Sequence, residues 1–511
     1  MSVPPAISKQ DGLDADERLR VGHVHPPEWV NPSPAARYDL VVLGGGTAGL
    51  VSAMGAAGLG ARVALVERHL LGGDCLNTGC IPSKALLRSA RAVEDVRRAE
   101  RLGVDVPVFR VDFTSVMGRL RARRASIAEH DSAARLKSAG VDVFFGEGRF
   151  VDPGTIVVDG RRLRFRRAVI ATGGRPAVPP VPGLEGVPFL TSETIFDLTE
   201  CPERLLVLGA GPIGCELAQA FARLGSSVTL LEQAGQVLPR EDPAAALIVE
   251  QALERDGVRI HVGVHVEQAQ TFGGALRLSI SRQADGRVER SEVTGGALLV
   301  ATGRAPNVEH LGLESAGVRW TDQGVVVNDR LESSNRRVFA SGDACSAYKF
   351  THAADAMSRV VLQNALFFGR RKARALVIPW VTFTDPELAH VGVTAAEAAA
   401  SGGRIDTITV NLSSVDRAVV DDDTAGFVRV HHERGRLRGC TIVARHAGEM
   451  IGEAVFALTH GGTCADLSST VHPYPTYAEA LRKIGDAYRR QALTSNATRW
   501  FKRYFEWTRW A

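Results

Sequence analysis

Residues 72–84 read GGDCLNTGCIPSK and place Cys75 and Cys80 five positions apart, in a chain of 511 residues with seven cysteines. In a straight α-helix, Cα atoms with this separation lie about 8–9 Å apart, beyond the ~7 Å limit for a disulfide. The two sulfurs can therefore bond only if the chain bends between them. Asn77 and Gly79 allow such a bend, because both residue types tolerate unusual backbone angles. The stretch predicts a redox-active cysteine pair.

A nucleotide-binding motif lies just before this pair. The mostly apolar segment Tyr38–Leu43 predicts a buried strand that leads into a Gly-x-Gly-x-x-Gly pattern. Such glycines let the backbone approach a pyrophosphate at the N-terminus of a helix. A second strand is predicted over Ala61–Val66, and Glu67 at its end stands where a carboxylate accepts hydrogen bonds from a ribose. The glycines of this motif are Gly44, Gly46 and Gly49.

The same motif recurs downstream with the same spacing. Predicted strands over Arg204–Leu208 and Ser227–Leu231 flank it, and Glu232 ends the second strand. In both units the acidic residue follows the first glycine by 23 positions. Two such motifs, each with flanking strands, predict two dinucleotide sites. The glycines of the second motif are Gly209, Gly211 and Gly214.

The order of the motifs predicts which cofactor each unit binds. The cysteine pair follows the first unit, so we expect this unit to hold a flavin, as FAD, and the second to hold the nicotinamide cofactor. Glu232 would repel the 2′-phosphate of NADP(H) and accept the free 2′-hydroxyl of NAD(H). The sequence therefore favours NAD(H). Arg223 and Arg240 leave NADP(H) open, because either could compensate for the acid.

The composition is that of a globular protein with several domains. Hydrophobic residues make up 45% of the chain and charged residues 23%. The net charge of +4 is too weak to indicate nucleic-acid binding. The other five cysteines are scattered, which argues against a disulfide-rich secreted protein and favours a reducing cytoplasm, and no structural metal site is predicted. No apolar run approaches the ~20 residues that span a bilayer.

Taken together, these motifs resemble the class I FAD-dependent pyridine nucleotide–disulfide oxidoreductases, a family that includes dihydrolipoamide dehydrogenase and mercuric reductase. Four further motifs follow in the order found in that family. The resemblance implies that Asp343 holds the ribityl chain of the flavin, that Gly73 and Gly173 also bind FAD, and that Gly303 binds NAD(P). The four motifs are ATGGRP at 171–176, ATGRAPN at 301–307, VFASGD at 338–343 and TFTDPE at 382–387.

The resemblance implies an α/β fold with two Rossmann-like domains, one for FAD and one for NAD(P), and a C-terminal α+β dimerisation domain. It also implies a homodimer, because the C-terminal segment must reach the cysteines of the other subunit. Residues 1–36 are polar and proline-rich and are expected to form a disordered lead. The other expected segments are 37–186 and 302–374 for the FAD-binding domain, 187–301 for the NAD(P)-binding domain, 375–490 for the interface domain and 491–511 for an amphipathic aromatic tail.

Two charged residues take catalytic roles from this resemblance. Lys84 corresponds to the lysine beside the flavin ring, where a cation stabilises negative charge on the reduced flavin. Glu216 corresponds to the glutamate that pairs with this lysine. The family mechanism implies that Cys80 lies nearer to the flavin and that Cys75 meets the electron acceptor. A helix that begins just after Cys80 would lower the pKa of its thiol.

The segment 472–479 reads HPYPTYAE and decides the expected substrate. Disulfide reductases of the family carry His-Pro-Thr-x-x-Glu here, in which the histidine moves a proton and the glutamate orients it. Anchoring on the Pro-Thr pair and Glu479 places Tyr474 in the position of the histidine. The alternative alignment keeps His472 as the base and inserts two residues before the glutamate. We prefer the first alignment, because it keeps the helix predicted over residues 479–484 in register.

Tyrosine changes the chemistry of this position. At neutral pH it is a poorer base than histidine by about 5 kcal/mol, so it is badly suited to cycling a dithiol. A tyrosine here resembles mercuric reductase, and Hg(II) needs no such proton shuttle. Soft thiolates such as those of Cys75 and Cys80 bind soft metal ions well.

The sequence therefore predicts a mercuric reductase-like oxidoreductase that passes electrons from NAD(P)H through FAD and the dithiol to a small molecule or metal ion such as Hg(II). Mercuric reductases usually carry paired cysteines at the C-terminus and often in an N-terminal metal-binding domain, and this chain has neither pair. Two alternatives stay open. One is a dihydrolipoamide dehydrogenase-type activity, and the other is a flavin-based redox sensor or membrane-attached adaptor.

The C-terminal tail adds a separate expectation. Residues 499–510 read RWFKRYFEWTRW and would place aromatic side chains on one face of a helix and mostly basic ones on the other. A basic helix this rich in tryptophan resembles those that lie at membrane interfaces. The alternative is a helix that docks on its own interface domain or on the second subunit. The expected location is the cytoplasm, with peripheral contact at the inner face of the membrane under the first interpretation.

Overall fold

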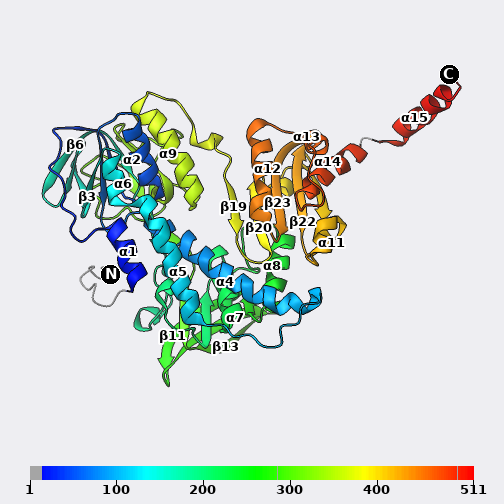
Figure 1. Cartoon of the computed structure of the whole chain (residues 1–511), viewed down its shortest axis with the longest axis horizontal. Coiled ribbons are helices and arrows are strands. Elements are labelled where there is room, and N and C mark those ends of the chain that lie inside the picture. Colours follow the sequence, from blue (N-terminus) through cyan, green and yellow to red (C-terminus); the bar gives the residue numbers. More distant parts are fainter. Residues whose placement is uncertain (1–13, 285, 492, 511) are drawn as a thin grey trace. The chain divides into compact units, whose positions relative to one another are not determined.

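The computed structural model describes residues 14–284, 286–491 and 493–510, which form two compact units (Figure 1). The first unit contains the residues up to 231 and residues 264–376, and the second contains residues 232–263 and those from 377 onward. Both units combine helices with sheets, as predicted for an α/β protein.

A mainly parallel sheet with an antiparallel extension forms the centre of the first unit. The central strand is buried along almost its whole length, and a strand pairs with it on each side. This explains why its sequence is apolar apart from Tyr38 and Asp39 at its start. In spatial order the strands are β3 (Val141–Phe145), β2 (Val63–Glu67), β1 (Tyr38–Leu43), β6 (Arg161–Ile170), β5 (Thr155–Val158) and β4 (Gly148–Asp152), and β18 (Val338–Ala340) also pairs with β6.

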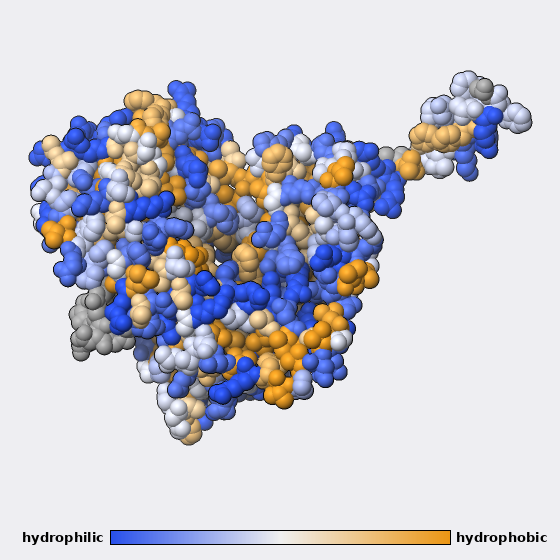
Figure 2. All heavy atoms as spheres, in the orientation of Figure 1, coloured by the Kyte–Doolittle hydropathy of each residue, from blue (hydrophilic) through white to orange (hydrophobic). Residues whose placement is uncertain are grey.

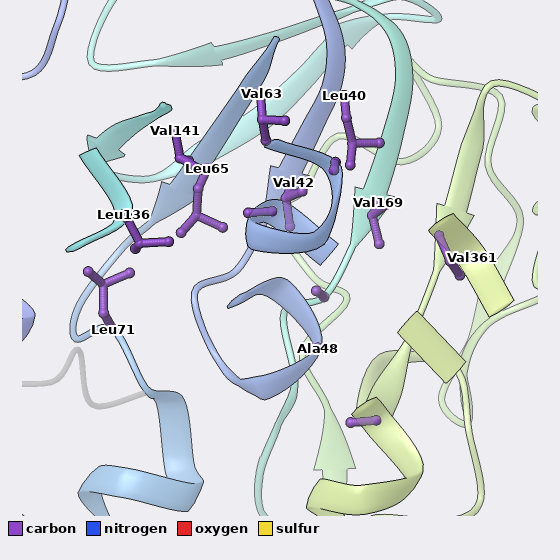
Figure 3. Close-up of a cluster of buried hydrophobic side chains, with 14 of the residues drawn as sticks. Leu40, Val42, Ala48, Val63, Leu65, Leu71, Leu136, Val141, Val169 and Val361 are labelled. Carbon is purple, nitrogen blue, oxygen red and sulfur yellow. The ribbon is translucent and has the colours of Figure 1, made fainter. Parts of the chain in front are cut away.

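Two helices from distant parts of the sequence, α2 (Thr47–Gly58) and α9 (Thr351–Leu366), pack against each other beside this sheet (Figure 1). The hydrophobic core between strands and helices is shown in Figure 3. Because β18 and α9 come from the later segment, the chain returns to the first sheet after the second nucleotide-binding motif. The core residues labelled in Figure 3 are Leu40, Val42, Ala48, Val63, Leu65, Leu71, Leu136, Val141, Val169 and Val361.

The second motif lies on a separate parallel sheet. Strands β14 (Ala297–Val300), β8 (Arg204–Leu208) and β9 (Ser227–Glu232) pair in that order, and α7 (Pro212–Leu224) follows β8. The helix is almost wholly buried from Gly214 onward. An antiparallel sheet follows the order β11 (Val264–Phe272), β12 (Ala275–Ala284) and β13 (Arg287–Gly295).

The second compact unit is built on a five-stranded antiparallel sheet. Its apolar face and the helices that cover it enclose a core that includes Val428, Ile442 and Leu481. In spatial order its strands are β19 (Pro379–Thr382), β20 (Glu387–Gly392), β23 (Arg436–Ala444), β22 (Phe427–Glu433) and β21 (Asp406–Asn411). Its helices are α8 (Pro243–Arg255), α10 (Ala395–Ala400), α11 (Asp416–Val420), α12 (Ala447–His460), α13 (Cys464–Ser469), α14 (Glu479–Gln491) and α15 (Ser495–Thr508).

The prediction of disorder over residues 1–36 is wrong for the part of this segment that the structure describes. Helix α1 (Ala15–Val24) begins at an N-cap, where Asp14 accepts a hydrogen bond from the backbone of Glu17 at 2.9 Å. Its inner face buries Val24 and the ion pair of Glu17 with Arg20. The composition of this segment does not indicate a helix, because part of the buried face is charged. Those charges are paired only in the tertiary fold. Residues 1–13 lie outside the described part.

Candidate active site

The cysteine pair lies where two helices meet. Cys75 belongs to α3 (Gly73–Asn77), and Cys80 is the first residue of α4 (Cys80–Arg98). At Gly79, between the helices, an added Cβ would lie 2.7 Å from the backbone oxygen of Asp74. No larger residue fits there without a shift of the backbone. The predicted bend is therefore present, and Gly79 permits it.

Asn77 has a different role from the one predicted. Its backbone is helical, and its amide group donates to the carbonyls of Leu71 at 3.0 Å and Gly73 at 2.9 Å. Its side-chain oxygen accepts a hydrogen bond from Arg20 at 2.5 Å, and its carbonyl accepts one from Arg124 at 2.8 Å. Asn77 therefore fixes the cysteine segment to α1 and to α5 (Phe113–Ala128). No local motif reveals either arginine, because each contact joins residues far apart in the sequence.

The two thiols differ in acidity. The pKa of Cys80 is lowered to about 6, chiefly by a hydrogen bond with Cys75 and further by Thr351 and Lys84. The hydroxyl of Thr351, in the first turn of α9, lies 3.3 Å from the sulfur of Cys80. The pKa of Cys75 is raised by the same hydrogen bond and by burial. Cys80 is therefore the more acidic thiol of the pair.

This difference predicts a pH-dependent reactivity. In the reduced protein, alkylation of Cys80 by iodoacetamide should be half-maximal near pH 6, because only the thiolate reacts and its fraction falls as the pH drops through the pKa. Mass spectrometry identifies the modified cysteine, and the rate is measured between pH 4.5 and 9. In a Cys75→Ala variant the midpoint should move upward, because the main stabilising hydrogen bond is gone. A wild-type midpoint near that of an ordinary thiol would contradict the assignment.

Lys84 and Glu216 form the predicted ion pair. The ammonium of Lys84, on α4, lies 2.8 Å from the carboxylate of Glu216, on α7. The glutamate side chain is 7% exposed and the lysine side chain 37%, so the acid is buried and the lysine is partly exposed to solvent. The pair joins the helix after the cysteines to the helix of the second nucleotide-binding motif.

The two glycine-rich turns have matching shapes. A Cβ added to Gly49 would lie 1.7 Å from the carbonyl oxygen of Gly44, and one added to Gly214 would lie 1.9 Å from that of Gly209. These glycines allow each helix to pack tightly on its preceding strand. By contrast, a Cβ added to Gly211 meets nothing within 4 Å. The space beside this glycine is therefore open, as the approach of a pyrophosphate to the backbone requires.

The acids after the strands accept backbone hydrogen bonds. Glu67 accepts from Gly45 at 2.6 Å and from His69 at 2.7 Å, and burial raises the pKa of its carboxyl group. Glu232 accepts from Ala234 at 2.8 Å. Both carboxylates lie at the ends of their strands, which is the position that the motif assigns to ribose recognition.

Gly73 and two of the family motifs gather around the first turn. A Cβ on Gly73 would lie 2.7 Å from the Cα of Gly46. Gly173, with φ of +69°, precedes β7 (Gly174–Pro176), which pairs with β15 (Arg304–Pro306) just after Gly303. The two Ala-Thr-Gly motifs, which are far apart in the sequence, therefore meet as an antiparallel pair.

A network of charged residues, which the sequence did not predict, connects these two motifs to the cysteine segment. The guanidinium of Arg304 donates to Asp343 at 3.2 Å, to the carbonyl of Gly174 at 3.0 Å and to Asp74. Asp74 is the neighbour of Cys75, so the network connects the cysteine segment to the residue expected to hold the ribityl chain. Arg304 lies inside a recognised motif, but the motif does not indicate its two acidic partners.

In the C-terminal segment the side chain of Tyr474 is exposed to solvent and that of His472 is buried. Tyr474 is 69% exposed, and its hydroxyl donates to Asp416 at 2.8 Å, which raises the pKa of the phenol. The imidazole of His472 lies 2.9 Å from the carboxylate of Glu453, and its side chain is only 5% exposed. Glu479 is buried at the start of α14 and pairs with Arg482 at 2.7 Å. Within this subunit, Tyr474 is thus the more accessible of the two candidates.

Comparison with known proteins identifies the family. Residues 38–358 match the family model described as "Pyridine nucleotide-disulphide oxidoreductase", and residues 378–484 match its "dimerisation domain". The chain belongs to the class I pyridine nucleotide–disulfide oxidoreductases. The fold class and the recognition from sequence are therefore confirmed. As a member of this family it is a flavoprotein oxidoreductase that uses FAD, and its dimerisation domain supports a homodimer.

Individual relatives include more than one activity. A mercuric reductase of Lysinibacillus sphaericus is 34% identical over 87% of this chain and 81% of its own length. A dihydrolipoyl dehydrogenase of Thermus scotoductus is 35% identical over 89% of this chain and 98% of its own length. The HOCl-induced flavoprotein disulfide reductase RclA from Escherichia coli superposes with a TM-score of 0.78, at 28% identity over 88% of this chain and 99% of that one. Another structure of RclA is a Cu(II) complex.

The residues of the first turn fit FAD. The tightly packed glycines would let a pyrophosphate approach the N-terminus of α2, and Glu67 would meet the ribose. Asp343, which accepts a hydrogen bond from Arg304, would meet the ribityl chain. None of the helices in the described residues is long and apolar enough to cross a membrane.

Proposed function

We propose that this oxidoreductase uses NAD(P)H to reduce a soft metal ion, such as Hg(II), through the dithiol of Cys75 and Cys80. The observation that carries the proposal is the position of the two thiols where α3 meets α4, with the Thr351 hydroxyl 3.3 Å from the sulfur of Cys80. The lowered pKa of Cys80 and the raised pKa of Cys75 agree with it. Bound FAD supplies the route by which two electrons pass from the nicotinamide to this pair. The relatives named mercuric reductase and the Cu(II) complex of RclA support a metal ion as the acceptor.

The residues around the pair prepare it for this chemistry. Thr351 and Lys84 keep the negative charge on Cys80, while Cys75 keeps the proton and can give it up when a metal ion binds. Two thiolates form a linear or bent site that soft ions prefer to oxygen ligands. The overall reaction balances as Hg(II) plus NADH giving metallic mercury, NAD⁺ and one proton. Lys84 is in turn held in place by Glu216.

We propose Tyr474, rather than His472, as the residue that the partner subunit presents to the thiols. Its exposure supports this choice, whereas the His472 side chain is only 5% exposed. Within one subunit the Tyr474 hydroxyl donates to Asp416, and it would turn from this acid to donate to the partner's thiols. The raised pKa of the phenol keeps it from serving as a base. Glu479 packs behind the segment and fixes the start of α14.

The Tyr474→Phe variant should therefore turn over Hg(II) about tenfold more slowly, the cost of one hydrogen bond in the transition state. His472→Gln should stay within about twofold of wild type, because glutamine can still reach Glu453. Tyr504→Phe, at a tyrosine outside the site, is the matched control. Steady-state kcat with NADH and Hg(II) measures all three. A large loss in His472→Gln with none in Tyr474→Phe would reverse the assignment.

We propose NAD(H) as the preferred nucleotide because of Glu232. The test of the whole function is a steady-state assay with NADH or NADPH as donor and Hg(II), Cu(II), oxidised lipoamide or quinones as acceptor. Metal-dependent oxidation of NADH at a rate well above that with lipoamide supports the proposal. Preference for lipoamide would favour the dihydrolipoamide dehydrogenase-type activity, to which the Thermus relative points. Negligible turnover with every acceptor would favour a redox sensor.

A further inference from the structure

The C-terminal helix α15 is the part of the chain that this function does not use. It spans Ser495–Thr508, and none of its residues is buried. It begins at a regular N-cap, where the Thr494 hydroxyl accepts from the backbone of Ala497 at 3.2 Å. A helix with a regular N-cap and large apolar side chains in solvent needs a partner for its apolar face.

The aromatic residues of α15 form one continuous face. Successive residues are about 100° apart around a helix, which places the five aromatic side chains within an arc of about 160°. Their rings also touch: Trp500 stacks on Tyr504 with centroids 5.8 Å apart, and Tyr504 lies 6.4 Å from Trp507. All are at least 40% exposed. They are Trp500, Phe501, Tyr504, Phe505 and Trp507.

The charged residues occupy the rest of the circumference. Four cations and one acid fall within an arc of about 120° opposite the aromatic face, so the helix together with its C-cap residue Arg509 carries a net charge of +3 there. Hydrophobic and hydrophilic residues lie side by side on this exposed helix in Figure 2. The charged residues are Arg499, Lys502, Arg503, Glu506 and Arg509.

We propose that α15 binds the surface of an anionic lipid bilayer and holds the enzyme at that surface. Tryptophan and tyrosine are the side chains that favour the boundary between lipid headgroups and acyl chains, and basic residues beside them face the anionic headgroups. At 14 residues the helix is about 21 Å long, and it carries charged residues from Arg499 onward, so it lies in the plane of the interface. A docking site on another protein copy would instead call for a complementary apolar and acidic surface.

Sedimentation of the full-length holoenzyme with lipid vesicles tests this proposal. Binding to vesicles of phosphatidylcholine with about 30% phosphatidylglycerol should be about 100-fold tighter than to phosphatidylcholine alone, because each of three net charges contributes about fivefold. Added salt should weaken the binding. The double variant Trp500→Ser with Trp507→Ser should bind at least about tenfold more weakly.

A pair of exchanged residues gives the sharpest control. Phe501→Arg combined with Arg503→Phe keeps the composition and net charge of the tail but places each residue on the wrong face. Loss of vesicle binding in this variant, with binding retained in Phe272→Ser at an exposed aromatic residue elsewhere, supports a segregated amphipathic helix. Because no residue of α15 is buried, thermal unfolding and flavin content should stay unchanged in all variants.

Three results would overturn the proposal. The first is equal binding, or none, to anionic and neutral vesicles. The second is unchanged binding in the exchanged variant. The third is that the tail variants convert the dimer to monomers in analytical ultracentrifugation without changing vesicle binding. That result would show that α15 docks on the second subunit. None of these readouts depends on which acceptor the enzyme reduces.

Discussion

Cys75→Ser and Cys80→Ser should each lower metal-dependent turnover by at least about 10³-fold while leaving FAD bound. Serine cannot form a disulfide, and its hydroxyl is neither a thiolate at neutral pH nor a ligand for a soft metal ion. Both side chains are nearly the same size, so the bend at Gly79 and the contact with Thr351 can persist. The loss should therefore lie in the chemistry and not in the fold.

Anaerobic reductive titration checks this result directly. The wild-type protein should take up four electrons per subunit, two for FAD and two for the cysteine pair, and each variant should take up two. Cys201→Ser is the matched control, because this half-buried cysteine lies near Ser226 and away from the site. Uptake of four electrons by either variant, or an equal loss of turnover in Cys201→Ser, would refute the role of the pair.

Gly49→Ala should abolish stable FAD binding. The new methyl group would lie 1.7 Å from the carbonyl oxygen of Gly44, a distance that no pair of non-bonded atoms tolerates, so α2 must move away from β1. Such overpacking costs about 1–3 kcal/mol or more of stability, and the movement opens the turn that a pyrophosphate would need. The purified variant should be colourless or nearly so, with a lowered midpoint of thermal unfolding.

Gly58→Ala on the same helix is the control for this change. A Cβ at Gly58 meets nothing within 4 Å, and alanine favours a helix over glycine by about 1 kcal/mol. This variant should keep its flavin and unfold at an equal or slightly higher temperature. Flavin absorbance per mole of protein and thermal unfolding measure both variants. Full flavin content in Gly49→Ala would show that the turn is not the cofactor site.

The features that the sequence predicted depend mostly on residues that are close together in the sequence. Strand β1 has the predicted bounds, and the two glycine-rich turns fold alike because steric demands at neighbouring residues define them. Gly79 permits the bend for the same reason. The ion pair of Lys84 with Glu216 was also expected, although through resemblance to a family and not through spacing.

The features that the sequence did not predict are long-range contacts. Thr351 reaches Cys80 across 271 positions, and Arg304 reaches Asp74 across 230. Asn77 appeared to be a turn residue, and the two arginines that hold it come from helices elsewhere in the chain. Helix α1 was missed because its charged inner face has the composition of a disordered segment.

The sequence by itself determined the two nucleotide-binding turns, the bend between the cysteines and the family, because each depends on residue types at short fixed spacings. Only the tertiary structure decided which side chains lower the pKa of Cys80 and which hold the cysteine segment in place. The pKa of Cys80 depends on Cys75, on Lys84 and on Thr351, whose hydroxyl lies 3.3 Å from the sulfur. Electrostatic interactions and hydrogen bonds act through space, and a linear pattern does not record which distant residues the fold brings within that range.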